Sequence, residues 1–184
     1  MAGTLEREIK LRFDSAAAAR DAVVAAGGVR IHERRLLEDA ILDTTDASLG
    51  SSSCALRIRV EPGRCFLTYK GPPQPSPVKL REELETEVGD AALAFALFER
   101  LGFRIWFRSE KYREEFALGD AVIAIDETPV GAFVEIEGTD EGIARAAAIL
   151  GRRREDYVAE SYRSIFVQHC LARGTSPGDM LFPR

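Results

Sequence analysis

The chain has 184 residues, of which 46% are apolar and 30% charged, and this composition is typical of one globular domain. Because 25 Lys and Arg stand against 30 Asp and Glu, the formal net charge is −5, which argues against a general nucleic-acid-binding protein. The apolar runs are too short to span a membrane and the N-terminal segment is too charged for a signal peptide, so we expect a cytoplasmic protein with no membrane partner.

The first half of the chain alternates strand and helix signals. An alternating strand over 4–13 is followed by a helix over 15–26, which Asp14 or Ser15 can cap and Gly27-Gly28 can end. Strands are then predicted over 29–43, 53–61 and 64–70. The last two are joined by the turn sequence Glu61-Pro62-Gly63-Arg64, so we expect an antiparallel hairpin.

The second half begins with the proline-rich segment 71–77, which cannot pair in a central ladder and predicts an exposed loop. Beyond it we predict strands over 78–88, 103–117, 120–127 and 132–138, and helices over 90–101, 139–150 and 155–173. We expect Trp106 and Phe107 to lie in the core. The domain should span 1–173 and be followed by a loosely ordered tail over 174–184, of which Met180, Leu181 and Phe182 could dock on the surface.

The strands share an unusual alternation, because their polar faces consist almost wholly of ionisable side chains. In the first strand Glu6, Glu8 and Lys10 share one face by the period of two, and Ile9 and Leu11 share the other. Eight strands closed into a barrel leave room inside for one small ligand. We therefore predict an α+β fold, in which helices cover the apolar outside of a closed eight-stranded antiparallel barrel and the charged faces line a tunnel.

Such a tunnel predicts a charged ligand, since each uncompensated buried ion costs several kcal/mol. Clustered Lys and Arg side chains match a polyanion, and the arginine fork matches phosphate oxygens. Carboxylates that do not pair with these bases match a hard divalent cation, and Mg²⁺ typically binds one or two carboxylates together with phosphate oxygens. The pattern indicates a site for a metal-bound polyphosphate and disfavours a barrel for a hydrophobic ligand.

An ordered series of motifs resembles the CYTH family, the triphosphate tunnel metalloenzymes, which include thiamine triphosphatases, inorganic triphosphatases and class IV (CyaB-type) adenylate cyclases. The series opens with Glu6-Arg7-Glu8-Ile9-Lys10, which is similar to the family's ExExK signature. It continues through Leu56-Arg57-Ile58-Arg59, Leu67-Thr68-Tyr69-Lys70, Arg81-Glu82-Glu83-Leu84-Glu85, Lys111-Tyr112-Arg113, Ile125-Asp126, Phe133-Val134-Glu135-Ile136-Glu137 and Ser161-Tyr162-Arg163. The resemblance covers residues 4 to about 168.

The resemblance implies roles for these charged positions. Mg²⁺ or Mn²⁺ would be bound by Glu6, Glu8, Glu135 and Glu137. The triphosphate would be bound by Lys10, Arg57, Arg59, Lys70, Arg81, Lys111 and Arg113. The catalytic residues would be Asp126, Lys10 and Glu85, with Asp126 or a tunnel glutamate accepting the proton of the attacking water. Ser161 and Tyr162 would close the tunnel by packing the last helix.

Three functions follow from this arrangement. The leading one is metal-dependent hydrolysis of a triphosphate, whether inorganic tripolyphosphate, thiamine triphosphate or a nucleoside triphosphate. A class IV adenylate cyclase, which converts ATP to cyclic AMP and pyrophosphate, would use the same anion and metal sites. A noncatalytic polyphosphate- or nucleotide-binding module is disfavoured, because anion binding alone would not need the carboxylates. The sequence leaves the substrate and the oligomeric state open.

Overall fold

The computed structural model describes residues 4–184, so residues 1–3 of the expected domain lie outside the described part of the chain. Within this range the strands form a closed barrel in the order β1-β5-β4-β3-β2-β6-β7-β8. Every neighbouring pair is antiparallel. The strands are β1 (Thr4–Phe13), β2 (Val29–Thr44), β3 (Ala55–Glu61), β4 (Arg64–Lys70), β5 (Lys79–Glu87), β6 (Phe103–Leu118), β7 (Ala121–Thr128) and β8 (Gly131–Glu137). The predicted closed antiparallel barrel is confirmed.

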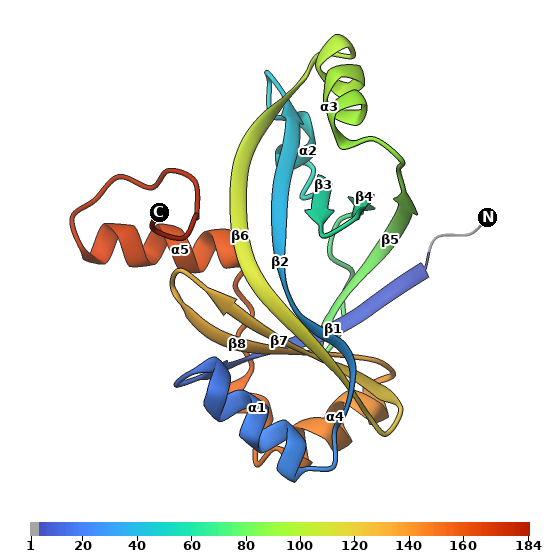
Figure 1. Ribbon diagram of the computed structural model, residues 1–184, viewed down its shortest axis with the longest axis vertical. Coiled ribbons are helices and arrows are strands. Elements are labelled where there is room, and N and C mark those ends of the chain that lie inside the picture. The colour runs from blue at the N-terminus through green and yellow to red at the C-terminus, as the bar shows by residue number, and fades with distance from the viewer. Residues whose placement is uncertain (1–3) are drawn as a thin grey trace.

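The helices lie outside the barrel, as expected. They are α1 (Ala16–Ala25), α2 (Ser48–Ser51), α3 (Ala91–Arg100), α4 (Asp140–Ile149) and α5 (Tyr162–Ala172). Figure 1 shows α1 and α4 together at one end of the molecule, α3 at the opposite end and α5 at the side, next to the long strand β6. Ser15 caps α1, Asp90 caps α3 and Thr139 caps α4, each by accepting a hydrogen bond from a backbone N–H of the first turn.

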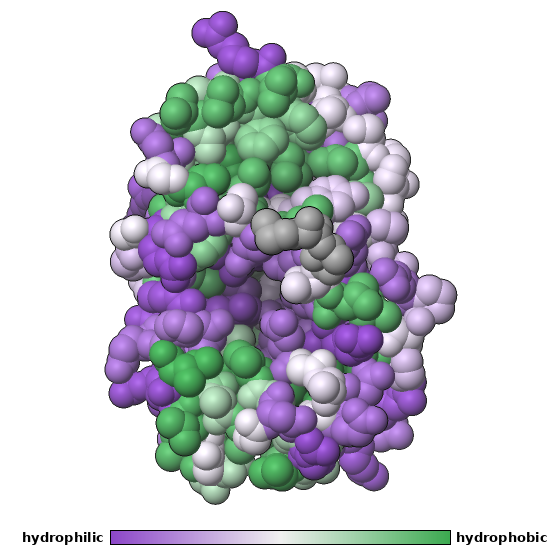
Figure 2. Space-filling model, turned by 90° about the vertical axis from the view of Figure 1, so that its right-hand side faces the viewer, coloured by the Kyte–Doolittle hydropathy of each residue, from purple (hydrophilic) through white to green (hydrophobic). Residues whose placement is uncertain are grey.

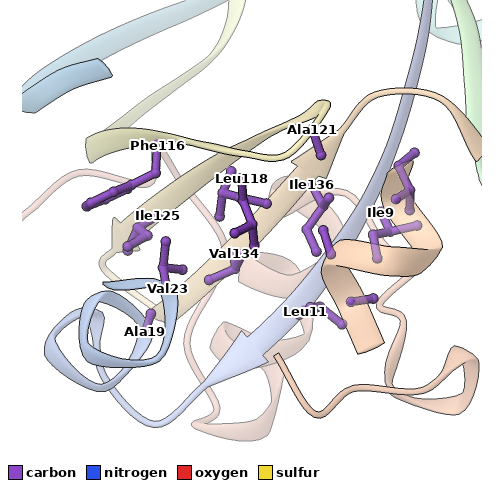
Figure 3. Packing of buried hydrophobic residues seen from close by; sticks show 14 residues of the cluster. Ile9, Leu11, Ala19, Val23, Phe116, Leu118, Ala121, Ile125, Val134 and Ile136 are labelled. Carbon is purple, nitrogen blue, oxygen red and sulfur yellow. The ribbon is translucent and has the colours of Figure 1, made fainter. Parts of the chain in front are cut away.

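The largest hydrophobic cluster lies between the outer face of the barrel and the helices α1 and α4 (Figure 3). Leu11, Val134 and Ile136 are fully buried there, and they alternate along β1 and β8 with the charged residues that face inward. Val23 of α1 and Ile143 of α4 pack against them. The apolar outside and charged inside predicted from the strand alternation are therefore observed.

The predicted helix over 155–173 is wrong in its first part. A short 3₁₀ turn over Arg154–Asp156 is followed by an extended segment, and α5 begins only after Ser161. Tyr157 bridges to Leu11, and the N–H of Val158 donates to the carbonyl oxygen of Lys10 at 2.8 Å. Because β5 starts opposite Glu8, the part of β1 after Glu8 has no neighbouring strand on that side. Residues 157–158 form hydrogen bonds with its backbone instead.

Two other segments form structure outside the predicted strands and helices. The short helix α2 follows Asp43, whose carboxylate accepts the backbone N–H groups of Leu49 and Gly50. In the tail, Met180 is buried and exchanges backbone hydrogen bonds with Arg108 and Glu110 of β6. The tail is thus attached to the edge of β6 at this point.

The structure holds no helix, over residues 4–184, with the length and apolar character needed to cross a membrane.

Candidate active site in the barrel interior

The barrel encloses a cavity of about 920 Å³ lined by charged side chains from its strands. Figure 2 shows hydrophilic residues around a hollow in the middle of one face, with hydrophobic residues above it over α3. Nearly all the site residues predicted from the sequence line this one cavity: Glu6, Glu8, Lys10, Arg57, Arg59, Lys70, Arg81, Glu85, Lys111, Arg113, Glu135 and Glu137. Asp126 faces the same way but lies behind this lining and is fully buried. Their roles stay predictions.

One part of the cavity is crowded with carboxylates, which we call the acidic cluster: Glu6, Glu8, Glu83 and Glu137. Glu8 lies opposite Glu137 in the pairing of β1 with β8. Desolvation on burial, together with the negative charges of the other three glutamates, raises the pKa of Glu137 to about 7. Glu137 has no ion-pair partner among residues 4–184.

Two lysines neutralise part of the acidic cluster. Lys70 Nζ donates to both carboxylate oxygens of Glu6, at 2.7 and 2.6 Å, and lies 2.8 Å from Glu83. Lys79 forms an ion pair with Glu8. Four carboxylates against two ammonium groups leave two negative charges when all are ionised, which matches one divalent cation.

A second part of the cavity, the basic centre, contains Arg57 and Arg59 from β3 with Lys111 and Arg113 from β6. Arg59 binds Asp39 through two hydrogen bonds of 2.7 and 2.8 Å. Burial lowers the pKa of Lys111 to about 8, and the charge of Arg113 acts in the same direction. Lys111 therefore titrates near pH 8.

Several guanidinium groups in the cavity have unused hydrogen-bonding capacity. Arg57 Nη2 donates to Thr68 Oγ1 at 3.0 Å and to Glu85 Oε2 at 3.3 Å. Its Nε, and the Nε of Arg81, are buried without a hydrogen-bond partner in the described part of the chain. Since a buried donor without a partner is costly, these two N–H groups are suited to the oxygens of an anionic ligand.

Asp126 holds the basic centre together from behind. Its carboxylate accepts hydrogen bonds from Lys111 at 2.8 Å, from Arg113 at 2.7 and 2.6 Å and from the Tyr162 hydroxyl at 2.7 Å. Burial alone would raise the pKa of Asp126, but Arg113 and Lys111 outweigh it and hold this pKa below its ordinary value. A fully buried carboxylate with four donors is suited to positioning cations rather than to accepting a proton from water.

Lys10 and Glu135 connect the two parts of the cavity. Glu135 lies 2.5 Å from Arg113 and 3.7 Å from Lys10. Lys10 Nζ also donates to the carbonyl oxygen of Glu160 at 3.0 Å and lies 4.0 Å from the centre of the Tyr162 ring. The start of α5 therefore packs onto this end of the basic centre.

The donor chemistry of the acidic cluster fits Mg²⁺ or Mn²⁺, which prefer carboxylate oxygens. Burial, and after it the charges of Glu6, Glu8 and Glu83, raise the pKa of Glu137, and a bound cation would stabilise its charged form. As arranged, however, no three acidic, His or Cys side chains within 4–184 converge on a point that could hold an ion. Lys70 and Lys79 occupy the oxygens of Glu6 and Glu8 instead.

Sequence reasoning missed several charged residues of the cavity, among them Lys79 and Asp39. Lys79 has the same strand parity as Arg81, so the alternation of β5 was a usable signal. Asp39 lies on β2, where register shifts near Arg30 and His32 interrupt the alternation. The contact that explains Asp39, its pair with Arg59, joins two strands and leaves no local pattern.

The expectation that Trp106 lies in the core is wrong, whereas Phe107 is buried. The pairing of β2 with β6 shifts register between Ile41 and Leu42, and Trp106 is the extra residue at this bulge. A bulge turns a side chain away from the regular alternation. Trp106 is 46% exposed at the edge of the cavity, with the guanidinium of Arg163 3.9 Å from its ring centre.

The chain is similar to known proteins over most of its length. The sequence model of the CYTH domain matches residues 4–162. A protein of Methanocaldococcus jannaschii named a "putative adenylate cyclase" is 30% identical over 152 residues, which are 82% of this chain and 86% of that protein.

Two solved structures share the fold. One, from Vibrio parahaemolyticus and described as a "putative adenylate cyclase", has a TM-score of 0.77 and 23% identity, and the match covers 89% of this chain and 98% of that one. The other, from Hippeastrum and described as a "putative adenylyl cyclase" with a dominant triphosphatase activity, has a TM-score of 0.67 and 23% identity, over 89% and 96% of the two chains.

Proposed function

The chain belongs to the CYTH domain family, and on this basis we propose that it hydrolyses a triphosphate with the help of a divalent metal ion inside the barrel. The observation that carries the proposal is the separation of charge in one cavity. Arg57 and Arg81 present unused N–H groups for phosphate oxygens, while the acidic cluster keeps a surplus of carboxylates for a cation. The triphosphatase activity named for the Hippeastrum protein supports this choice.

The basic centre would bind and orient the phosphate chain. Arg57, Arg59, Lys111 and Arg113 supply its positive charge from two strands, and Asp126 and Asp39 hold three of these side chains in place. Lys10, Lys70 and Arg81 would extend the contacts toward the acidic cluster. Fixed donors in a partly desolvated cavity stabilise charge that develops on the phosphates during cleavage.

Glu6, Glu8 and Glu137 would hold the metal ion, with Glu135 beside them. When bound, Mg²⁺ or Mn²⁺ neutralises phosphate charge and lowers the pKa of water.

In the reaction, a water oxygen attacks the terminal phosphorus and the bond from that phosphorus to its bridging oxygen breaks, leaving orthophosphate and the shortened chain. The water's proton passes to a carboxylate. We assign this step to Glu85, which is exposed to the cavity and whose partners are Thr68 and Arg57, and we assign Asp126 to positioning.

A second candidate is the cyclase reaction, which the name of the Methanocaldococcus relative favours. There the 3′-hydroxyl of ATP would attack the α-phosphorus and pyrophosphate would leave. The same basic and acidic groups would serve both reactions, so the products distinguish them.

The test is incubation of the purified protein with Mg²⁺ or Mn²⁺ and, separately, ATP, thiamine triphosphate and tripolyphosphate, followed by chromatography of the products. Hydrolysis gives orthophosphate and a diphosphate from at least one substrate. Cyclic AMP with pyrophosphate would establish the cyclase instead. Binding without turnover of any of the three would reduce the protein to a polyphosphate-binding module.

A further inference from the structure

Lys79 is a cavity residue outside the motif series. It opens β5 directly opposite Glu8 of β1, and its ammonium group forms an ion pair with the Glu8 carboxylate. Desolvation by itself would lower the pKa of Lys79, but Glu8 and Glu135 outweigh it and raise this pKa above its ordinary value. The side chain is therefore a permanent positive charge beside a proposed metal ligand.

Lys79 differs from Lys70 in how firmly it is held. Lys70 contacts two carboxylates, Glu6 and Glu83, and its side chain is 18% exposed. Lys79 contacts one carboxylate, and its side chain is 36% exposed. A lysine is a compact charge on a flexible four-carbon chain, so an ammonium with one partner and open space beside it is free to exchange that partner.

The position of Lys79 also points to a second partner. Lys79 lies opposite Glu8, and Glu135 lies opposite Lys10, the next residue of β1 on the same face. Glu135 contacts Lys10 and Arg113, at the junction with the basic centre. Lys79 therefore stands between the carboxylates proposed for the metal and the cations proposed for the phosphate chain.

We propose that Lys79 is a positioning residue that occupies the Glu8 carboxylate in the metal-free barrel and transfers its ammonium to a phosphate oxygen when a divalent cation takes its place. This inference rests on the proposed metal and triphosphate sites. The exchange makes the metal ion and the triphosphate bind cooperatively. The metal ion releases Lys79 from Glu8, and the triphosphate gives the released ammonium group a new partner. A metal ion alone must displace Lys79 without giving it a new partner.

The test compares Mn²⁺ binding in Lys79→Met and in the unaltered protein by electron paramagnetic resonance of free Mn²⁺. Without triphosphate, Lys79→Met should bind Mn²⁺ at least about tenfold more tightly, because a charge-assisted contact no longer competes. With imidotriphosphate, the non-hydrolysable analogue of tripolyphosphate, the unaltered protein should gain Mn²⁺ affinity, and Lys79→Met should gain about tenfold less.

Arg7→Gln is the matched control. Arg7 lies between Glu6 and Glu8 on β1 but points outward, 3.8 Å from Asp140, and its removal also deletes one positive charge. It should change Mn²⁺ affinity less than about twofold, since exposed charges are screened. Equal effects of the two substitutions, or unchanged Mn²⁺ affinity in Lys79→Met, would overturn the inference.

The outcomes separate this inference from the proposed function. Neither binding measurement requires turnover, so both can give the expected result in a protein that hydrolyses no triphosphate. In that case only the proposed reaction is wrong. Undetectable Mn²⁺ binding in the unaltered protein and in Lys79→Met would overturn the inference together with the metal site. Circular dichroism of each variant verifies that the barrel is intact.

Discussion

Arg113 and Asp126 form a two-point ion pair between the neighbouring strands β6 and β7, with Nε to Oδ1 at 2.7 Å and Nη2 to Oδ2 at 2.6 Å. The two residues face each other directly in the strand register. The same carboxylate accepts hydrogen bonds from the ammonium group of Lys111 and from the Tyr162 hydroxyl. One fully buried acid thus fixes two of the four cations of the basic centre and the start of α5.

Asp126→Asn should therefore destabilise the ligand-free fold. Removing one partner of a buried ion pair costs about 3–5 kcal/mol, because the remaining charges stay buried without compensation. Urea unfolding measures the loss, and added tripolyphosphate should recover part of it by supplying negative charge. Unchanged stability together with abolished turnover would instead assign Asp126 to proton transfer.

Tyr162→Phe is a milder change at the same carboxylate, and its effect on stability is compared with that of Asp126→Asn. It removes one donor to Asp126 and leaves the pairs with Lys111 and Arg113. A hydrogen bond to a charged group is worth about 1.5–3 kcal/mol, so the loss in unfolding free energy should be smaller than that of Asp126→Asn. A larger loss than in Asp126→Asn would contradict the ordering.

Arg57→Ala should weaken binding of tripolyphosphate about tenfold to hundredfold, and binding of orthophosphate much less, because only the longer anion spans the basic centre. Arg57→Lys should restore part of the affinity, since an ammonium cannot reproduce the planar fork. Isothermal titration calorimetry of both anions gives the comparison. Similar losses for the two anions would show a general basic surface instead of an extended site. The same comparison applies to Arg59→Ala, which also leaves Asp39 without its partner.

Triphosphate binding should weaken as the pH rises through about 8. The pKa of Lys111 is about 8, so its ammonium is charged below this pH and loses its proton above it. A calorimetric series from pH 6.5 to 9.5 should show constant affinity followed by a decline. In Lys111→Met the affinity should be lower at pH 6.5 and should lack this decline, and a decline identical to that of the unaltered protein would place the titrating group elsewhere.

Glu137→Gln should stabilise the metal-free protein at pH 8. The pKa of Glu137 is about 7 in the folded protein, against an ordinary value of 4.5 for a glutamate, so the charged form is disfavoured in the fold. This destabilisation is absent below pH 4.5, develops as the pH rises and is complete above pH 7. In thermal unfolding with a chelator present, Glu137→Gln should have a higher melting temperature than the unaltered protein at pH 8. At pH 4.5 the two melting temperatures should differ little.

Glu33→Gln is the control. It should leave the melting temperature unchanged at both pH values, because the Glu33 side chain is 77% exposed. A stabilisation of Glu137→Gln that is equally large at pH 4.5 would reject like-charge crowding as its cause.

The strands and their inward faces could be predicted because a period of two is a local property of the chain. The parity of Glu6 with Glu8 and of Glu135 with Glu137 was enough to place all four in one cavity. The partners of these charges could not be predicted, since the pair of Lys79 with Glu8 joins residues 71 positions apart. The separate acidic and basic parts of the cavity follow from such pairs.

The irregular segments of the backbone could not be predicted from the sequence either. The segment 157–161 has residues compatible with a helix, and it is extended because β5 leaves part of β1 unpaired. Trp106 is a large aromatic residue of the kind that usually lies in a core, but the bulge opposite Ile41 and Leu42 leaves it exposed at the edge of the cavity. Both outcomes depend on which strands are neighbours and where each one ends.

The central claim is metal-dependent hydrolysis inside the barrel, and Glu8→Gln tests it most directly. Orthophosphate release from tripolyphosphate is followed by phosphorus NMR across an Mn²⁺ titration, for Glu8→Gln and the unaltered protein, with circular dichroism as the check on folding. We expect release by the unaltered protein and none by the folded Glu8→Gln variant at any Mn²⁺ concentration. Equal release by the two proteins at saturating Mn²⁺ would contradict the claim.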